Sequence, residues 1–592
     1  MDNKVFPIYR NDIDGLRAIA VLAVILFHMG YLPNGYLGVD VFFVISGYLI
    51  TKIIYAEAIE NKFSIYQFYL RRIRRIIPLM LFTTLVALIT GLFVMLPDDL
   101  ENLSQSVIAT NFFANNILLK ITTVNYWNII NDYKPLMHTW SLGIEEQFYL
   151  VYPLLFLICN KKRVKWVLPI LVILTGFSLL LFVISTNEAA KFFTIPFRFF
   201  ELSLGGIGAI VFKEKGINSN YKLFLIIALL VLLYLETHIP NHLKLIAVVI
   251  ISFGILVSNY DYNKWNAFIL ENKVMIGIGK ISFSLYMWHQ IVLAFSRYFI
   301  LETISITNAV FIGVTILVLS LLSYFFIEQP FRNKEKIKNT VLLFSTGVGL
   351  IISTAIAFYI YSISGILKDV PELDIVKDNT QKNSNVINVK RNPHIKYNAR
   401  IYDFNNEFTN TPTTKVLVIG ASFARDWGNV LLESKYGNQI ELSYVEDINY
   451  CKNFEERIRQ AKCIFLAEKN GTNRSWLDSI ARIYKIDTSK VWNVGLKNFG
   501  ANNGIYYNRK NNPDYCSQRT KMITGILERN ELLKKQWKNK YIDVMGSIID
   551  KKNTIPVFTN QCKFISQDCK HFTKSGATYF GEIIDLKPYL NP

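Results

Sequence analysis

The sequence predicts two domains of different class: a polytopic α-helical membrane domain of about eleven transmembrane helices, and a C-terminal soluble α/β domain with a parallel sheet. Three observations predict this. Long apolar segments recur through the first 362 residues, the composition turns polar near Leu367, and short apolar runs then alternate with helical stretches. The chain has 592 residues, 51% of them hydrophobic, and is too long for one compact domain.

Hydropathy places the spanning segments, because a helix of about 20 apolar residues crosses the hydrocarbon core. Asp12 and Asp14 precede the first segment and no clean cleavage site follows it, so we expect a retained helix and not a signal peptide. The segments lie near 13–30, 37–56, 77–96, 136–159, 166–185, 193–212, 222–236, 243–259, 275–300, 308–327 and 340–362.

The net charge of +19 admits nucleic-acid binding, but the positions of the cations favour membrane orientation. Cations gather in alternate loops, at 71–75, 161–165, 213–222, 264–273 and 332–338, whereas the loop 96–135 is richer in acids. This asymmetry predicts a cytoplasmic N-terminus, and an odd number of crossings then places the C-terminal domain outside, in the periplasm or beyond the cell. We expect membrane lipids as partners and no nucleic acid.

The resulting domains are 1–335, a membrane domain of about ten helices; 336–412, an extra transmembrane helix and a polar linker without helical periodicity; and 413–592, the soluble domain. Its strand-like runs are 416–419, 440–445, 463–467, 491–494 and 555–558. Their alternation with helical stretches predicts a parallel sheet covered by helices.

The first apolar segment carries Arg17 and His28, eleven positions apart. On a helix they fall within ~20° of one face and ~16 Å apart along the axis. Ionisable groups in a membrane helix usually line a polar interior, although both residues could instead reach the two interfaces.

The cations at 71–75 are either topogenic or a phosphate clamp. Glu145 and Glu146, at the edge of a span, need a partner, for which histidine or arginine is the natural choice.

In the soluble half, Ser422 follows a predicted strand through Gly420-Ala421 and opens a helix, whose N-terminal amides can support an oxyanion. Asp568 precedes His571 by three residues, so one loop could orient the imidazole toward Ser422. We assign other histidines and acids of this half, such as His394 and Asp426, to the linker or the surface.

The cysteines also separate the two halves. Cys159 ends a membrane segment, and the other five lie in the C-terminal part, which suits an oxidising compartment. An odd number leaves at least one unpaired, and the spacing does not fix the pairing. The spacing fits no zinc motif, so no metal is expected. These five are Cys451, Cys463, Cys516, Cys562 and Cys569.

Six stretches in order resemble the acyltransferase family three of integral-membrane, acyl-CoA-dependent enzymes: DGLRAIAVLAVILFH (14–28), GYLGVDVFFVISGYLI (35–50), FYLRRIRRIIP (68–78), HTWSLGIEEQFYLVYP (138–153), ISFSLYMWHQ (281–290) and SYFFIEQPFR (323–332). The resemblance implies acetyl-CoA as the acyl donor. It implies a catalytic role for His28 assisted by Glu145, and donor binding by Arg17, Arg72 and Arg75.

The C-terminal half resembles the SGNH (GDSL-like) hydrolases, with Ser422 as nucleophile and Asp568 and His571 as the closing DxxH block. Ala421 replaces the aspartate usual beside the serine. The family's asparagine matches either Asn470 or Asn498, and the glycine donor of the oxyanion hole is not located.

Together the resemblances imply an O-acetyltransferase of the bacterial inner membrane that carries acetyl from cytoplasmic acetyl-CoA to a carbohydrate hydroxyl outside. Lipopolysaccharide O-antigen is the first choice of acceptor, before peptidoglycan and exopolysaccharide. A glycan or lipid transporter or flippase with a non-catalytic outer domain is the alternative of another class, and an esterase on a membrane anchor is the third. The net charge of residues 363–592, 35 Lys and Arg against 24 Asp and Glu, weakly favours anionic glycans or lipid headgroups.

Overall fold

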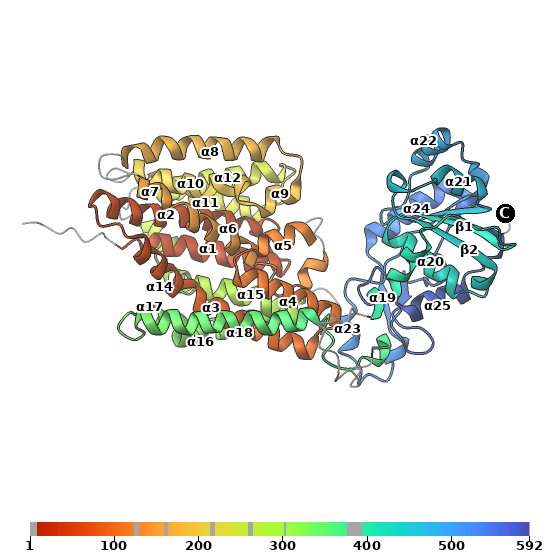
Figure 1. Cartoon of the computed structure of the whole chain (residues 1–592). Coiled ribbons are helices and arrows are strands. Elements are labelled where there is room, and N and C mark those ends of the chain that lie inside the picture. Colours follow the sequence, from red (N-terminus) through yellow and green to blue (C-terminus); the bar gives the residue numbers. More distant parts are fainter. Residues whose placement is uncertain are drawn as a thin grey trace, which may run out of the picture. The chain divides into compact units, whose positions relative to one another are not determined.

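The chain folds into two compact units, seen in a computed structural model that describes residues 9–122, 129–158, 164–212, 220–258, 264–300, 304–375 and 393–590. The first unit comprises Met1–Phe93 and Asn102–Phe358, and the second comprises Val94–Glu101 and Tyr359–Pro592. The first is helical, and the second contains a sheet with helices around it (Figure 1).

Every predicted spanning segment coincides with helical structure. The helices are α1 Asn11–His28, α2 Gly38–Ile59, α3 Ile65–Val94, α6 Thr139–Val151 with α7 Leu154–Ile158, α8 Val167–Ile184, α10 Ile195–Val211, α11 Asn220–Tyr234, α12 Asn241–Val257, α15 Ser282–Arg297, α16 Ile306–Ser323 and α18 Asn339–Ser362. Within the described residues, five helical segments are long and apolar enough to cross a membrane, and α11 and α12 are shorter apolar helices. The count of eleven crossings stays a prediction.

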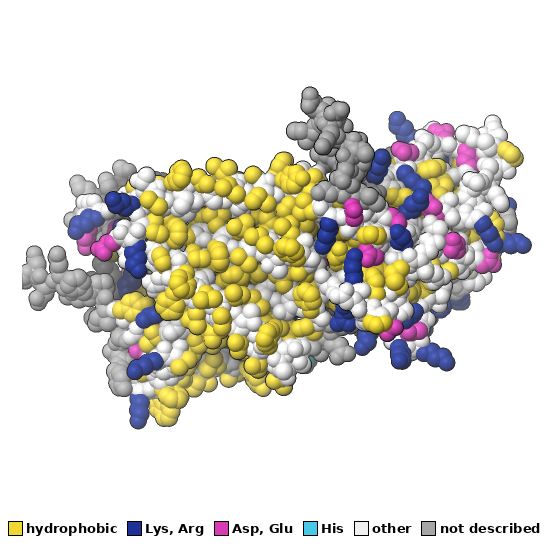
Figure 2. Space-filling model, turned by 90° about the horizontal axis from the view of Figure 1, so that it is seen from below, with side chains coloured by type: hydrophobic (Ala, Val, Ile, Leu, Met, Phe, Trp, Pro, Cys, Tyr) yellow, Lys and Arg dark blue, Asp and Glu magenta, His cyan; other side chains and the backbone are white. Residues whose placement is uncertain are grey.

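The surface of the helical unit is apolar, while charged groups lie inside it. Large hydrophobic side chains such as Ile173 on α8, Phe311 on α16 and Phe344 on α18 are exposed. Figure 2 shows hydrophobic side chains over most of one face of this unit. Arg198, by contrast, is buried between Asp40 (2.7 Å) and Glu201 (2.8 Å). Paired charges inside and apolar groups outside are the arrangement of a membrane protein.

Small residues allow a close helix contact in this unit, between α2 and α10. A side chain at Gly47 would place its Cβ 1.7 Å from the backbone oxygen of Leu202, and one at Gly205 would meet the oxygen of Val44 at 2.1 Å. Membrane helices use such residues to bring their backbones together.

Two expected loops are helical. The cations at 71–75 lie within the early turns of α3, which begins at Ile65 and continues through Pro78, and not in a loop before the span. The region 96–135 contains α4 Pro97–Asn111, α5 Asn115–Thr122 and the 3-10 turn Ile129–Tyr133. Hydropathy marks only the apolar part of a helix, so a polar or cationic extension escapes it.

The main sheet of the second unit has five parallel strands in the order β2-β1-β3-β4-β6. Four of them match predicted runs: β1 Thr414–Ile419, β2 Ile440–Val445, β3 Cys463–Leu466 and β4 Val491–Val494. The fifth, β6 Tyr541–Ile542, was not expected. The run 555–558 was wrong as a member of this sheet, because β7 Thr554–Pro556 pairs antiparallel with β5 Arg519–Lys521 in a separate sheet.

Helices cover both faces of the main sheet. Helices α20 Ser422–Glu433 and α25 Lys574–Ile583 contribute Trp427 and Phe580 to the larger core. Helices α21 Phe454–Gln460, α22 Arg474–Tyr484 and α24 Thr524–Trp537 contribute to the core on the other face. The predicted parallel sheet with helical cover is confirmed.

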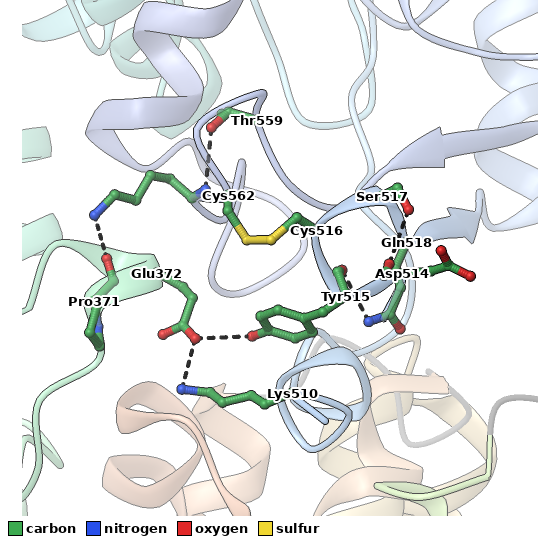
Figure 3. Close-up of a disulfide and its surroundings, with 11 residues drawn as sticks. Pro371, Glu372, Lys510, Asp514, Tyr515, Cys516, Ser517, Gln518, Thr559 and Cys562 are labelled. Carbon is green, nitrogen blue, oxygen red and sulfur yellow. Dashed lines mark hydrogen bonds and ion pairs between the residues drawn. A yellow bond between two sulfur atoms is a disulfide. The ribbon is translucent and has the colours of Figure 1, made fainter. Parts of the chain in front are cut away.

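Part of the expected linker belongs to the second unit. The turn Pro371–Leu373 is bound to it through Glu372, whose carboxylate accepts hydrogen bonds from Tyr515 (3.3 Å) and Lys510 (2.7 Å; Figure 3). Helix α19 Pro393–Ala399 and the turn Arg400–Phe404 follow, and Ile401 is fully buried in the larger core. The polar composition had concealed these anchors. Residues 376–392 lie outside the described residues.

Cys516 and Cys562 form a disulfide beside this turn (Figure 3). Cys451, Cys463 and Cys569 are free thiols, the last two of them buried. Cys159 lies outside the described residues.

Candidate functional site

A cavity of about 330 Å³ in the helical unit brings together four residues expected from the sequence: Arg17, Arg72, Arg75 and Glu145. They come from α1, α3 and α6. Arg332, from the short helix α17 Gln329–Arg332, also lines the cavity and was not expected as a site residue. It closes the SYFFIEQPFR stretch, so the motif contained the signal.

Helix α3 divides its arginines by face. Arg71 pairs with Glu57 at 3.1 Å. Arg74 is buried and donates to the backbone oxygens of Phe331 (2.9 Å) and Ile337 (2.7 Å). Arg72 and Arg75 face the cavity one turn apart and form no ion pair with a carboxylate of the described residues. They are therefore the cations left to hold an anionic ligand, such as a phosphate.

Glu145 is held by hydroxyl groups, which corrects the expected histidine or arginine partner. The hydroxyls of Ser46 on α2 and Tyr149 on α6 both donate to its carboxylate. Tyr149 also places its ring 5.6 Å below the Arg72 guanidinium. Two hydroxyl donors satisfy an acid in a low-dielectric interior without a counter-charge.

His28 is not among the residues that line the cavity. Its ring centroid lies 5.4 Å from that of His289, which lies 5.2 Å from that of His138. Tyr286 both lines the cavity and lies 5.3 Å from the His138 ring, so it stands between the cavity and the histidines. His289 donates from Nδ1 to the Tyr286 carbonyl at 2.5 Å, which leaves Nε2 as an acceptor. These partners were missed as site residues, although they lie in the HTWSL and ISFSLYMWHQ stretches.

In the second unit, Ser422, His571 and Asp568 are joined by hydrogen bonds in that order. The His571 Nε2 lies 2.9 Å from Ser422 Oγ, and its Nδ1 lies 2.6 Å from Asp568 Oδ2. In the tautomer that satisfies both contacts, His571 donates from Nδ1 to Asp568 and accepts the Ser422 proton at Nε2. This is the geometry of a nucleophile, a general base and an orienting carboxylate.

The loop around His571 keeps Asp568 ionised. Burial by itself would raise the pKa of Asp568, but the hydrogen bond and charge of His571 hold it well below the usual carboxyl value. The backbone N–H groups of His571 (2.8 Å) and Lys570 (3.0 Å) donate to its second oxygen. Four adjacent residues thus orient the imidazole and stabilise its charged form.

Gly420 shapes the turn that presents Ser422. Its φ is +129°, and a Cβ there would lie 2.4 Å from the backbone oxygen of Ala467 and 2.8 Å from Glu468 Oε1. Only glycine fits a turn with this φ at so close an approach. Ser422 is consequently the first residue of α20, at the edge where β1 ends.

The two asparagines expected near the oxyanion lie in different settings. Asn498 is buried, and its Oδ1 accepts from the N–H groups of Gly500 (3.2 Å) and Ile523 (3.2 Å), so it stabilises its own loop. Asn470 lies in the exposed turn after β3. An oxyanion role for either one stays a prediction.

Asp426 and His394 are buried, which corrects their assignment to the surface or linker. Asp426 accepts from Lys497 Nζ and from the backbone N–H of Phe572 (3.1 Å). Lys497 also donates to the Lys570 carbonyl at 2.6 Å. The pair therefore holds both neighbours of His571. Sequence reasoning missed it because the two residues are 71 positions apart.

An apolar helical unit with an arginine-lined cavity and an α/β unit with a serine–histidine–aspartate arrangement are combined in this membrane protein. A family model described as an acyltransferase domain, the acyltransferase-3 model, matches residues 10–325. The chain belongs to this family.

Curated relatives agree with this assignment. The chain is 33% identical over 356 residues to a protein of Staphylococcus aureus MSSA476 provisionally named an O-acetyltransferase, covering 56% of this chain and 58% of the relative. It is 31% identical over 366 residues to the O-acetyltransferase OatA of S. aureus NCTC 8325, covering 56% and 60%. The chain thus spans about three fifths of the relatives it matches. No solved structure matches it.

Proposed function

We propose that this protein is an O-acetyltransferase that moves acetyl from cytoplasmic acetyl-CoA across the membrane to hydroxyls of a cell-surface glycan. The observation that carries the proposal is the hydrogen-bonded series Ser422–His571–Asp568 in a chain whose first half is an acyltransferase domain. The relatives are named as O-acetyltransferases, which supports the O-acetyl specificity.

The donor end of the proposed reaction uses the arginine-lined cavity. Arg72 and Arg75, with Arg17 and Arg332 beside them, match the several negative charges of coenzyme A phosphates. The acetyl carbon lies at the end of a long pantetheine arm, so the phosphates and the reacting carbon occupy different places. We assign the acyl transfer to His28, assisted by Glu145 in the cavity, with Tyr286 between the cavity and the histidines.

The acceptor end uses the outer unit. Ser422 Oγ attacks the acetyl carbonyl carbon while His571 Nε2 takes the serine proton. The bond from the acetyl to its carrier then breaks, and His571 gives that proton to the departing carrier and becomes neutral again. A sugar hydroxyl then attacks the acetyl-serine, His571 removes the hydroxyl proton, and Ser422 leaves with that proton restored. Asp568 stabilises the imidazolium in both steps. In this proposal the outer unit faces the periplasm or the cell exterior, and lipopolysaccharide O-antigen is the first acceptor to test, before peptidoglycan and exopolysaccharide.

The deciding experiment measures the acetyl content of surface glycans by mass spectrometry in cells that carry the protein, lack it, or carry His28→Ala or Ser422→Ala. We expect each variant to lower acetylation by at least about a hundredfold. Ser475→Ala, an exposed serine of α22, is the matched control and should match the unaltered protein. The glycan fraction that loses acetyl identifies the acceptor.

The other outcomes separate the alternatives. If Ser422→Ala lowers glycan acetylation and His28→Ala does not, the protein is an esterase-type enzyme on a membrane anchor. Normal acetylation in both variants contradicts the proposal and favours a transporter. Arg72→Ala with Arg75→Ala tests the donor end and should raise the KM for acetyl-CoA, whereas Arg459→Ala on exposed α21 should leave it unchanged.

A further inference from the structure

The second unit has a cavity of about 600 Å³ at the carboxyl ends of three neighbouring strands. Ile419 at the end of β1 and Leu466 at the end of β3 both line it. The strand order reverses between β1 and β3, because β2 lies on one side of β1 and β3 on the other. Open α/β sheets bind ligands at such a switch point. Ala421 lines the cavity too, and the next residue is Ser422.

The lining of this cavity is acidic in a cationic part of the chain. Glu446, Asp447 and Glu468 line it, and no lysine or arginine of the described residues does. Residues 363–592 as a whole carry 35 Lys and Arg against 24 Asp and Glu. Within the described part of the chain, none of the three carboxylates forms an ion pair. Asp447 accepts a hydrogen bond from the backbone N–H of Asn449 (2.9 Å). The cavity therefore repels anions, although the surrounding domain attracts them.

Two further lining residues indicate a sugar ligand. Thr472 is 6% exposed, and its hydroxyl has no hydrogen-bond partner among the described residues. An unpaired buried hydroxyl costs about 1–3 kcal/mol, which a ligand hydroxyl would offset. Trp476 is 39% exposed on α22 and also lines the cavity. An exposed indole offers a flat apolar face on which the C–H face of a pyranose can pack.

We propose that this cavity is the acceptor subsite beside Ser422 and that it takes a neutral or amino-bearing pyranose and rejects an acidic one. The carboxylates accept the O–H or N–H groups of the sugar, Thr472 pairs with a ring substituent, and Trp476 covers the ring. The inference rests on the proposed function, because it takes Ser422 as the acetyl carrier. It also opposes the expectation of an anionic glycan drawn from net charge.

The test measures binding without any acyl donor, so it is independent of catalysis. The full chain in detergent is titrated with chitosan, chitin and galacturonate oligomers of equal length, and binding is followed by NMR saturation transfer and calorimetry. We expect the chitosan and chitin oligomers to bind at least about tenfold more tightly than the galacturonate oligomer. Trp476→Ala should weaken both by about tenfold. In the double variant Glu446→Gln with Asp447→Asn, the ratio of the affinity for the chitosan and chitin oligomers to the affinity for the galacturonate oligomer should fall by about tenfold.

Glu455→Gln, an exposed carboxylate of α21 outside the cavity, is the matched control and should bind like the unaltered protein. The unfolding midpoint of each variant is measured beside that of the unaltered protein, so that a folding defect is recognised. The inference would be overturned if the galacturonate oligomer bound as tightly as the others, or if no oligomer bound at millimolar concentration. It would also be overturned if the cavity variants bound the oligomers like the unaltered protein. Failure of the proposed function appears separately, as normal glycan acetylation by Ser422→Ala.

Discussion

Lys497 connects three parts of the outer unit through one ammonium group. It bonds to Asp426 on α20 and to the Lys570 carbonyl, and lies 3.8 Å from the Phe423 ring centroid. Burial lowers the pKa of Lys497, while the adjacent Asp426 carboxylate counteracts the shift. Because Asp426 also holds the Phe572 N–H, this pair fixes the peptide groups on both sides of His571. It is a positioning pair for the general base.

Lys497→Met should destabilise the outer unit by about 3–5 kcal/mol, because the buried Asp426 carboxylate then keeps only its longer ion pair with Arg425 (3.8 Å). The double variant Asp426→Asn with Lys497→Met should lose less free energy of unfolding than the two single variants lose together. Urea unfolding of the full chain, followed by pulse proteolysis of the outer unit, measures both. A positioning role also predicts that the folded single variant loses kcat for acetyl-ester hydrolysis more than it raises KM. Additive free energies, or an unchanged kcat, would contradict the assignment.

His394 makes the stability of the outer unit depend on pH. Burial lowers its pKa from 6.5 to about 4, against the opposing charges of Asp374 and Asp568. Between these values the unfolded chain binds a proton that the folded chain does not, so stability falls as pH drops from about 6.5 to about 4. The loss should reach about 3 kcal/mol. Urea midpoints measured across this range should decline less in His394→Gln. An equal decline in both proteins would refute the role of this residue.

At the scale of elements, the close approach of α2 and α10 depends on two glycines. Gly47→Leu would drive a side chain into the Leu202 carbonyl of α10, since even a Cβ lies 1.7 Å from that oxygen. We expect a loss of at least about 1–3 kcal/mol, seen as a lower thermal midpoint in detergent. Gly176→Leu on α8 is the matched control, because a Cβ there meets nothing within 4 Å. Equal midpoints for the two variants would show that α2 and α10 do not pack as described.

The disulfide is a cysteine pairing that the sequence does not determine. Cys516 and Cys562 are 46 positions apart, and the bond closes the region that contains β5, α24, β6 and β7. A closed loop of this length stabilises by about 2–4 kcal/mol in the chain-entropy account. Cys516→Ala with Cys562→Ala should lower the urea midpoint of the outer unit accordingly, whereas Cys451→Ala should not. A midpoint unaffected by loss of the disulfide would contradict this.

At the scale of the whole molecule, loop charges and the disulfide both predict an outer location for the second unit. Cys451 is a half-exposed free thiol, whereas Cys463 and Cys569 are buried. A membrane-impermeant maleimide should therefore label the protein in intact spheroplasts, and Cys451→Ser should abolish most of that label. Labelling that requires lysis would place the unit in the cytoplasm and reverse the proposed direction of transfer.

The sequence by itself determined what depends on local pattern. Apolar segments became helices, because apolar length and helical periodicity are properties of a short stretch. The strands β1 to β4 followed for the same reason. The pairing of Asp568 with His571 could be predicted because that contact spans only three residues of one loop.

Only the tertiary structure decided which faces meet. It gave Glu145 its hydroxyl partners from α2 and α6, brought Arg332 to Arg72, and buried Asp426 against Lys497. It also placed the two-residue strand β6 in the main sheet and moved β7 to another. A periodic pattern tells which side of an element is buried, but the identity of its neighbour depends on contacts between residues far apart in the chain. The acidic cavity beside Ser422 is such a product, because its lining comes from the ends of three strands and the loops that follow them.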